Sequence, residues 1–187
     1  MIRHLTPAGY TAMPWANGRG RTVEMLRETG PDGGLLLRLS MANVVEDGAF
    51  SIFPGVERNL TVISGPGFEL VGETRIKAEP LIPVAFPGDV AMAAVGVTAP
   101  CEDFNVMTAR RMPLPEVRVL TGTEVSPNGG RLALFALNAG AVSGRAVGRH
   151  DLILTGDVAR MVGGPFIVVG LMGINDGQIA HPTGIRR

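Results

Sequence analysis

The chain has 187 residues, including 26 glycines and 14 prolines, and its 17 basic residues balance its 17 acidic ones. A formal net charge of zero, without a long basic stretch, argues against nucleic-acid binding, which needs a surplus of Lys and Arg on one face. So many turn-forming residues between short apolar runs disfavour a helical protein and are typical of strands joined by tight turns.

Patterns that favour a helix are scarce, and the best of them covers residues 21–28 between two glycines. Short runs rich in apolar and β-branched residues predict a series of strands instead. In chain order these cover residues 35–44, 60–64, 68–72, 74–78, 90–95, 103–109, 117–121, 131–137, 151–154, 158–162 and 166–172. The last run is apolar enough to be a central core strand. The prediction is an all-β sandwich or barrel fold with very little helix.

Two stretches of the chain resemble each other. Residues 84–92 and 152–160 each contain an apolar strand, a Gly-Asp turn and a strand that opens with Val-Ala. Another apolar strand precedes each copy. Gly-Asp turns are common enough for this to be coincidence, but the spacing suits two tandem units of cupin size.

We therefore predict a bicupin of two tandem jelly-roll units. The first covers residues 1–112 and carries the ligand site, and the second covers residues 113–187 and is structural. Residues 109–116 contain two prolines and have the composition of a linker between them. The N-terminal segment is expected to add strands to both sheets.

Few residues could bind a metal or act as a nucleophile. His4, His150 and His181 are the only histidines, and no two have the spacing of metal ligands, so neither a metal nor a cofactor is expected. Cys101 is the only cysteine, which excludes an intrachain disulfide. The acidic residues after it disfavour a reactive thiolate, so we expect an inert thiol.

The sequence also lacks signals for a membrane or for secretion. No apolar stretch has the length of a transmembrane helix, and the N-terminus has no charged region followed by an apolar one. We expect a cytoplasmic protein with no membrane partner.

Arg38 interrupts the apolar residues 35–39 of a predicted strand. Alternation along a strand places Leu36, Arg38 and Ser40 on one face. A buried arginine needs an anionic partner. Two interpretations stay open: a solvated edge strand or an internal ion pair, or an anion receptor inside a barrel.

Residues 50–60 contain two phenylalanines and a Pro-Gly turn, and Arg58 follows at the start of a strand. Such a loop could close over a ligand whose carboxylate Arg58 would hold with its two-pronged guanidinium. It could equally be a structural turn with an arginine at the surface.

Residues 103–107 place Asn105 among apolar neighbours. Asp103, Asn105 and Met107 share one face of the predicted strand, and Phe104 lies on the other with Val106. An inward asparagine amide can donate to and accept from a ligand, or it can satisfy the backbone.

Residues 13–24 read Met-Pro-Trp-Ala-Asn-Gly-Arg-Gly-Arg-Thr-Val-Glu. This stretch resembles the opening signature of the HutD/Ves family, roughly Met-Pro-Trp-Lys-Asn-Gly-Gly-Gly followed by Thr-Arg-Glu. Further blocks match in the family's order: Arg-Leu-Ser at 38–40, Phe-Ser at 50–51, Phe-Pro-Gly at 53–55 with Arg58, Phe-Pro-Gly-Asp at 86–89 and Asp-Phe-Asn-Val-Met at 103–107. The resemblance implies a bicupin fold without metal ligands. It also implies a role in histidine utilisation, through binding of a pathway intermediate or regulation of flux.

Four positions depart from the family pattern and bear on which ligand is bound. Ala16 stands where lysine is usual, Arg19 replaces a glycine, Val23 replaces an arginine and Leu37 replaces a tryptophan. The matching polar residues are Asn17, Thr22, Glu24, Arg38, Ser40, Arg58 and Asn105.

The leading hypothesis is a metal-free protein that binds a small anionic ligand, such as a carboxylate or a formylated or formimino amino acid, and that supports histidine utilisation. The predicted ligand-binding residues are Trp15, Asn17, Thr22, Glu24, Arg38, Ser40, Phe53, Arg58, Phe104 and Asn105. The two arginines would hold a carboxylate, the asparagines would orient an amide or formyl group, and the aromatic residues would form the walls.

Two other functions stay open. An enzyme would use Glu24 or Asp103 as a general base on the same class of ligand. A protein–protein regulator without a ligand would show a large exposed apolar patch and no deep cavity. A homodimer that pairs through sheet faces or edges is compatible with each of them.

Overall fold

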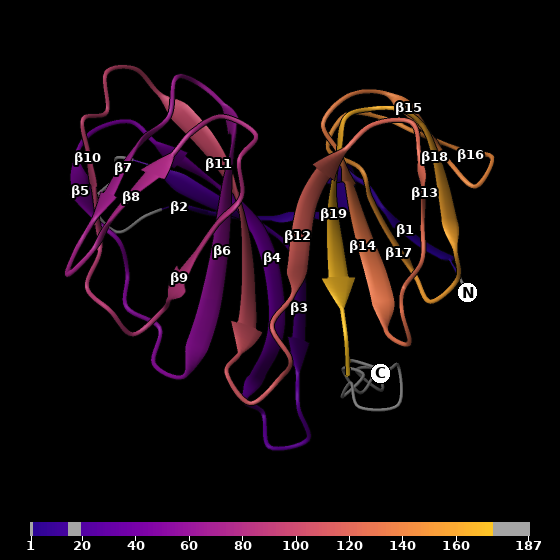
Figure 1. Cartoon of the computed structure of the whole chain (residues 1–187), viewed down its shortest axis with the longest axis horizontal. Helices are drawn as coiled ribbons and strands as arrows, with labels where there is room; N and C mark the ends of the chain where they lie inside the picture. The colour runs from indigo at the N-terminus through magenta and orange to yellow at the C-terminus, as the bar shows by residue number, and fades with distance from the viewer. Residues whose placement is uncertain (1, 15–19, 174–187) are drawn as a thin grey trace, which may run out of the picture.

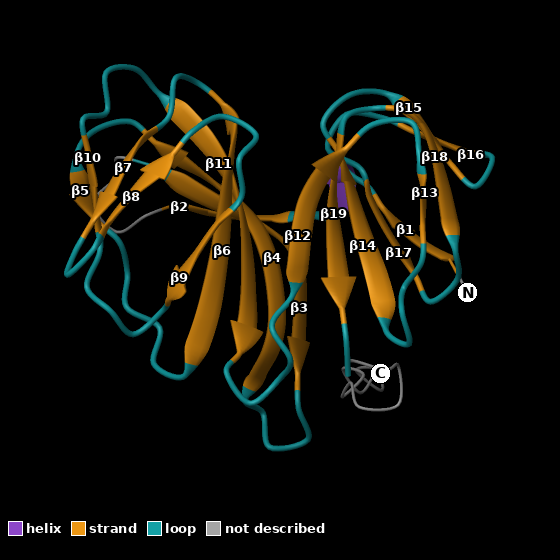
Figure 2. Cartoon of the chain, viewed as in Figure 1, coloured by secondary structure: helices purple, strands orange, loops and turns teal. Residues whose placement is uncertain are grey.

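A computed structural model describes residues 2–14 and 20–173 of the chain (Figure 1). In these residues the elements are the strands β1 to β19 and one short 3-10 helix, η1 (Pro7–Gly9), so the all-β prediction is confirmed (Figure 2). The strongest helical pattern, residues 21–28, lies in strand β3 because pairing with β2 on one side and β4 on the other overrides local preference. None of the helices in the described residues is long and apolar enough to cross a membrane.

The first half of the chain forms two antiparallel sheets that face each other. The larger has the order β2 (Thr11–Pro14), β3 (Arg21–Thr29), β4 (Leu35–Val44), β11 (Cys101–Ala109), β6 (Val56–Ser64) and β9 (Val84–Pro87). The smaller has the order β5 (Gly48–Ala49), β10 (Ala93–Val95), β7 (Phe68–Val71) and β8 (Arg75–Ala78). Apolar side chains from both sheets, among them Leu60, Val62, Phe68 and Leu70, form one core cluster.

The second half repeats this arrangement. Its larger sheet has the order β1 (Ile2–Leu5), β17 (Leu152–Thr155), β14 (Arg131–Ala136), β19 (Phe166–Leu171) and β12 (Glu116–Leu120). Its smaller sheet has the order β13 (Glu124–Val125), β18 (Ala159–Gly163), β15 (Gly140–Val142) and β16 (Arg145–Val147). Strand β19 is almost wholly buried between β14 and β12, which confirms the predicted central core strand.

The two halves share their strand order. The order β9-β6-β11-β4 in the first half corresponds to β17-β14-β19-β12 in the second, and β5-β10-β7-β8 corresponds to β13-β18-β15-β16. The Gly88-Asp89 turn follows β9, and the Gly156-Asp157 turn follows β17. The sequence similarity around these turns thus falls at equivalent places in the two halves. Each sheet is open, with an edge strand at both ends.

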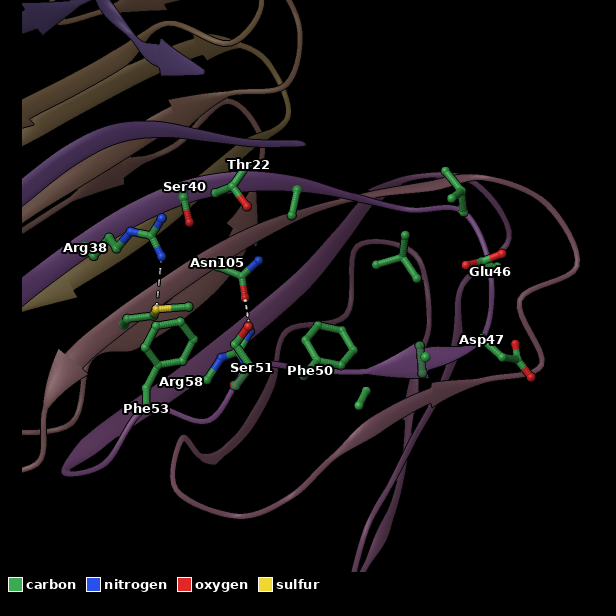
Figure 3. A pocket seen from close by; sticks show the side chains of 17 residues that line it. Thr22, Arg38, Ser40, Glu46, Asp47, Phe50, Ser51, Phe53, Arg58 and Asn105 are labelled. Atoms are coloured by element: carbon green, nitrogen blue, oxygen red, sulfur yellow. Dashed lines mark hydrogen bonds between the residues drawn. The ribbon is translucent and has the colours of Figure 1, made fainter. Parts of the chain in front are cut away.

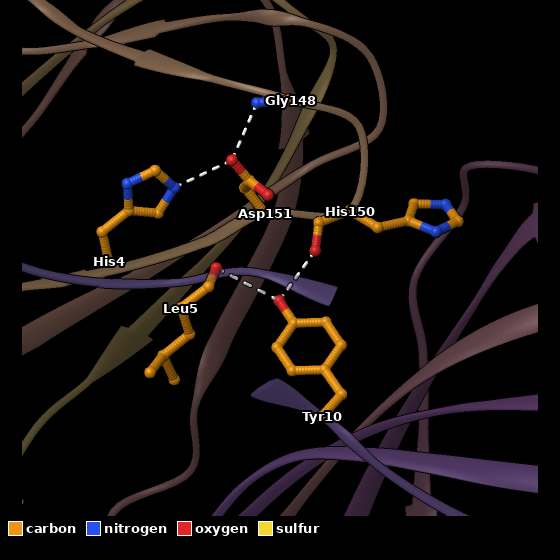
Figure 4. A network of polar contacts seen from close by, with 6 residues as sticks. All are labelled: His4, Leu5, Tyr10, Gly148, His150 and Asp151. Atoms are coloured by element: carbon orange, nitrogen blue, oxygen red, sulfur yellow. Dashed lines mark hydrogen bonds and ion pairs between the residues drawn. The ribbon is translucent and has the colours of Figure 1, made fainter. Parts of the chain in front are cut away.

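The N-terminal segment contributes to both halves, as predicted. Strand β1 pairs with β17 in the second half, and β2 pairs with β3 in the first. Polar contacts hold the segment in place (Figure 4). The Tyr10 hydroxyl donates to the His150 carbonyl at 2.7 Å, and His4 Nε2 lies 2.8 Å from Asp151 Oδ2.

The two larger sheets pack against each other and enclose a separate core. Leu39, Phe104 and Val106 of the first half meet Phe135 and Ile167 of the second in this cluster. The rings of Phe104 and Phe135 are stacked with their centroids 4.7 Å apart. The larger sheet of the first half therefore has one face toward the second half and one toward its own small sheet.

Candidate functional site

A pocket of about 480 Å³ opens in the first half, on the face of the larger sheet that is turned away from the second half (Figure 3). Its polar and charged lining residues are Thr22, Arg38, Ser40, Glu46, Asp47, Ser51, Arg58 and Asn105. Its other lining residues are Ala42, Val44, Val45, Gly48, Ala49, Phe50, Phe53, Ala94 and Met107.

Strand register brings the two arginines together. Met107 of β11 lies opposite Arg38 of β4 on one side and opposite Arg58 of β6 on the other. All three side chains point to the same face of the sheet, because residues opposite each other in paired strands share a face. Arg38 and Arg58 thus reach the same end of the pocket, as Figure 3 shows.

Arg58 is the most deeply buried charged residue of the pocket, with 5% of its surface exposed. Its Nη2 donates to Asn105 Oδ1 at 3.0 Å, and its Nη1 donates to the Ser51 carbonyl at 3.4 Å. The guanidinium lies 5.1, 5.5 and 4.9 Å from the ring centres of Phe50, Phe53 and Phe86. Within the described part of the chain its Nε has no hydrogen-bond partner.

Burial lowers the pKa of Arg58 to about 10, with the nearby Asp103 opposing this change. The group therefore stays cationic at neutral pH. A desolvated cation that lines a pocket is suited to bind an anion.

Arg38 is also buried, and its Nε donates to Glu24 Oε2 at 2.6 Å. Its Nη1 has a weak acceptor, the Met107 sulfur, at 3.8 Å. The internal ion pair considered for Arg38 is therefore present, and Arg38 lines the pocket as well.

Asp103 lies next to Asn105 on the pocket face of β11 but does not line the pocket. It has no exposed surface, and Asn105 Nδ2 donates to its Oδ1. Its Oδ2 finds no hydrogen-bond partner among residues 2–14 and 20–173. Burial raises the pKa of Asp103 to about 7, although Arg58 and Asn105 act in the opposite direction.

Two acidic residues, Glu46 and Asp47, line the end of the pocket away from the arginines (Figure 3). The backbone N–H of Val97 donates to Asp47 Oδ1 at 2.8 Å, and this bond lowers the pKa of Asp47. The carboxylate is thus ionised at neutral pH. The pocket has a cationic end and an anionic end.

Six of the ten predicted ligand-binding residues line the pocket: Thr22, Arg38, Ser40, Phe53, Arg58 and Asn105. Glu24 contacts Arg38 and is not a lining residue. Phe104 is not a pocket wall, because the alternation along β11 turns it away from Asn105 and into the core between the halves. Trp15 and Asn17 lie outside the described residues.

The positions that depart from the family pattern do not line the pocket where they are described. Leu37 belongs to the core between the halves, and Val23 packs against that core. Ala16 and Arg19 lie outside the described residues.

The sequence did not mark Glu46 or Asp47 as pocket residues, and it placed Phe50 only in a loop that could close over a ligand. Glu46 and Asp47 follow β4 in a short loop, and no local pattern distinguishes them from ordinary surface acids. Ala42 and Val44 lie on the same face of β4 as Arg38 and Ser40, because alternate residues of a strand share a face. The same alternation, followed to the end of β4, would have predicted both as pocket residues.

In the described part of the second half, the buried polar or charged residues are Arg131, Asp151 and Thr155. Its core cluster consists of apolar side chains such as Leu134, Val142, Met161 and Phe166. Within the described residues, no group of three His, Cys, Asp or Glu side chains lies close enough to hold a metal ion. Cys101 is a buried free thiol.

The family described as HutD matches residues 8–167. The chain is 32% identical over 159 residues to an uncharacterized 21.2 kDa protein in the hutC 3′ region of Pseudomonas putida. This alignment covers 81% of this chain and 83% of that protein.

Solved structures with similar folds include HutD from Pseudomonas fluorescens SBW25, described for a formate condition. It has a TM-score of 0.82 and 29% identity, and the match covers 92% of this chain and all of that one (100%). The conserved protein of unknown function PA5104 from Pseudomonas aeruginosa PAO1 has a TM-score of 0.76 and 28% identity, over 90% of this chain and 96% of that one. The protein Ylba from E. coli, with a TM-score of 0.59 and 12% identity over 93% and 92% of the two chains, shares the fold alone.

Proposed function

This chain belongs to the HutD family, and on that basis we propose that it is a metal-free protein that binds a small carboxylate in the pocket of its first half. The family is linked to the histidine-utilisation locus, so the binding would support or regulate histidine utilisation. The observation that carries the proposal is the pair of buried arginines, Arg38 and Arg58, on either side of Met107 at one end of the pocket.

Both guanidinium groups favour a carboxylate over other ligands. Arg58 is desolvated at the end of the pocket, so a charge-assisted hydrogen bond from its guanidinium to an anion would compensate for its buried charge. Arg38 Nη1 would exchange a weak sulfur acceptor for a carboxylate oxygen. Two planar guanidinium groups also match the geometry of a carboxylate better than ammonium groups would.

The acidic end of the pocket supports a ligand that is cationic at its other end. A formimino group is protonated at neutral pH, and Glu46 and Asp47 would favour it electrostatically. A formyl group is neutral and would gain nothing from these two residues. We therefore rank a formimino amino acid above its formyl counterpart.

We further propose that the two halves are tandem cupin-like units, residues 1–112 with the ligand site and residues 113–187 with a structural role. The shared strand order supports this division. The apolar interior of the second half supports its structural role.

Binding without turnover is favoured over general-base catalysis. Neither Glu24 nor Asp103 lines the pocket, and each is engaged with another side chain. A general base has to come within hydrogen-bond reach of the proton it removes. The presence of a pocket likewise favours a ligand-binding protein over a regulator without a ligand.

Isothermal titration calorimetry with the purified chain tests the proposal. The ligands are N-formimino-L-glutamate, N-formyl-L-glutamate, urocanate, L-histidine and formate, the simplest carboxylate. We expect saturable binding of at least one dicarboxylate, with the formimino compound bound more tightly than the formyl compound. A folded sample that binds none of them up to millimolar concentration would contradict the proposed function.

A further inference from the structure

Arg58, Asn105 and Asp103 form a chain of hydrogen bonds that runs from the pocket into the interior of the first half. Arg58 Nη2 donates to Asn105 Oδ1 at 3.0 Å, and Asn105 Nδ2 donates to Asp103 Oδ1. The asparagine amide thus turns its oxygen to the cation and its nitrogen to the carboxylate. Asn105 thus connects Asp103 to Arg58, the residue that would hold the ligand, so the charge state of Asp103 affects Arg58 through this amide.

Asp103 is an unusual group to bury. It has no exposed surface, and its Oδ2 has no partner in the described parts of the chain. An ionised carboxylate in such a place is costly unless a cation compensates for it. A buried polar group that is only half satisfied calls for an explanation beyond packing.

Of the charged groups around Asp103, Arg58 is the one that compensates for the negative charge of its ionised carboxylate. Strand β6 contributes Arg58, which favours the ionised form, and β11 itself contributes Glu102, which disfavours it. Strand β4 places Ala42 opposite Asp103 and carries Arg38 farther along. The described residues that the facing small sheet turns into this core are apolar, because the alternation along β7 and β8 puts its charged residues on the outer face.

An anion bound to Arg58 would remove this compensation. In the empty pocket, Arg58 and an ionised Asp103 balance each other's charge. A ligand carboxylate brings a second negative charge to the same cation, and burial already favours the neutral form of Asp103. The neutral acid is then the more stable state.

We propose that Asp103 is a positioning residue that takes up one proton when a carboxylate binds to Arg58. This inference rests on the proposed function, because it requires an anion in the pocket. The proton comes from solvent and forms an O–H bond at Oδ2, since Oδ1 accepts from Asn105. No other bond changes, and the net charge of the site is the same before and after binding.

Calorimetry on the unaltered protein gives the first test, with N-formyl-L-glutamate as the probe because none of its groups titrates between pH 6 and 8. Titrations at pH 7 in buffers of different ionisation enthalpy measure the protons taken up. Asp103 is about half protonated at pH 7 before binding, so on average we expect roughly half a proton to be taken up per ligand. The affinity should be about 5- to 10-fold higher at pH 6 than at pH 8.

The Asp103→Asn variant assigns the effect to this residue. Asparagine has the same shape, stays neutral and can still accept from Asn105 through its side-chain oxygen. We expect no proton uptake and an affinity at pH 8 close to that of the unaltered protein at pH 6. Asp32→Asn changes an exposed aspartate in the turn between β3 and β4 and serves as the control, with unchanged pH dependence.

The outcomes separate this inference from the proposed function. Binding without proton uptake and with the same affinity at pH 6 and pH 8 overturns the role of Asp103 and leaves the pocket as the ligand site. A pH dependence that persists in folded Asp103→Asn also overturns it. If N-formyl-L-glutamate does not bind between pH 6 and 8, the same titrations are made with the formimino compound; absence of binding by all five ligands overturns the proposed function, and the inference with it.

Discussion

Glu28 of β3 and Arg131 of β14 form a buried ion pair between strands of the two halves. Arg131 Nη1 donates to Glu28 Oε1 at 3.1 Å, and Arg131 Nη2 donates to Glu28 Oε2. The two side chains are 2% and 9% exposed, respectively. The contact is bidentate and joins the two larger sheets next to the core that they share.

Removal of one charge of this pair should destabilise the protein strongly. Glu28→Gln leaves a buried guanidinium without its counter-ion, so we expect a loss of about 3–5 kcal/mol in the free energy of unfolding. Denaturant unfolding measures it. Glu116→Gln is the control, because it breaks an exposed contact with Arg118, and should cost at most about 1 kcal/mol. A Glu28→Gln variant as stable as this control would show that the pair does not join the halves energetically.

Arg58→Lys should weaken carboxylate binding while it keeps the positive charge. An ammonium group has no planar fork and cannot reproduce the contacts to Asn105 and Ser51 together with a two-pronged contact to the ligand. We expect an affinity for N-formyl-L-glutamate at least about 10-fold lower, since each 1.4 kcal/mol lost is tenfold. Arg75→Lys, on the exposed surface, should bind like the unaltered chain. Equal affinity of both variants would rule out Arg58 as the carboxylate ligand.

The stability of the empty protein should depend on pH through Asp103. Its pKa in the folded state is about 7, above the value of about 3.9 for an exposed aspartate. Its contribution to stability is therefore fully present below about pH 4 and lost as the pH rises through 7. Between pH 5 and 8 the free energy of unfolding should fall by roughly 2–3 kcal/mol.

Asp103→Asn should remove most of this fall, which urea unfolding at pH 5, 6.5 and 8 can measure. His150 gives both proteins the opposite trend, because burial lowers its pKa and its contribution is lost as the pH falls. Identical slopes in the two proteins would mean that Asp103 does not titrate in this range.

The two Gly-Asp turns provide a matched pair of substitutions. A Cβ on Gly88 would lie 2.8 Å from the Val56 carbonyl oxygen and 2.9 Å from that of Phe53, whereas the nearest atom to one on Gly156 is 4.0 Å away. Gly88→Ala should displace the segment that carries Phe53 and cost about 1–3 kcal/mol of stability. Gly156→Ala should stay within about 0.5 kcal/mol.

Ligand titration then shows whether the pocket depends on this turn. We expect weaker binding in Gly88→Ala and unchanged binding in Gly156→Ala. Equal effects of the two substitutions on stability and binding would contradict this account of the first turn.

Much of the site follows from alternation along single strands. The pattern in residues 35–44 and 103–107 places Arg38 with Ser40 and Asn105 with Met107, and the structure has both pairs on the pocket face. The same alternation excludes Phe104 from the pocket, but only once it is known which face of β11 lines the pocket. No local pattern marks the acidic end of the pocket, because Glu46 and Asp47 owe their place to the path of a loop.

The sequence by itself determined that this protein is built of strands, and it suggested a repeat whose first copy holds the candidate ligand-binding residues. Strand preference, turn chemistry and alternation act over a few neighbouring residues, so they can be read locally. Only the tertiary structure decided that β3 is a strand, that β1 pairs with β17, and that Arg38 and Arg58 lie on either side of Met107. It also decided that Asp103 loses contact with water. These features depend on register and on burial between sheets, which are set by partners far away in the chain.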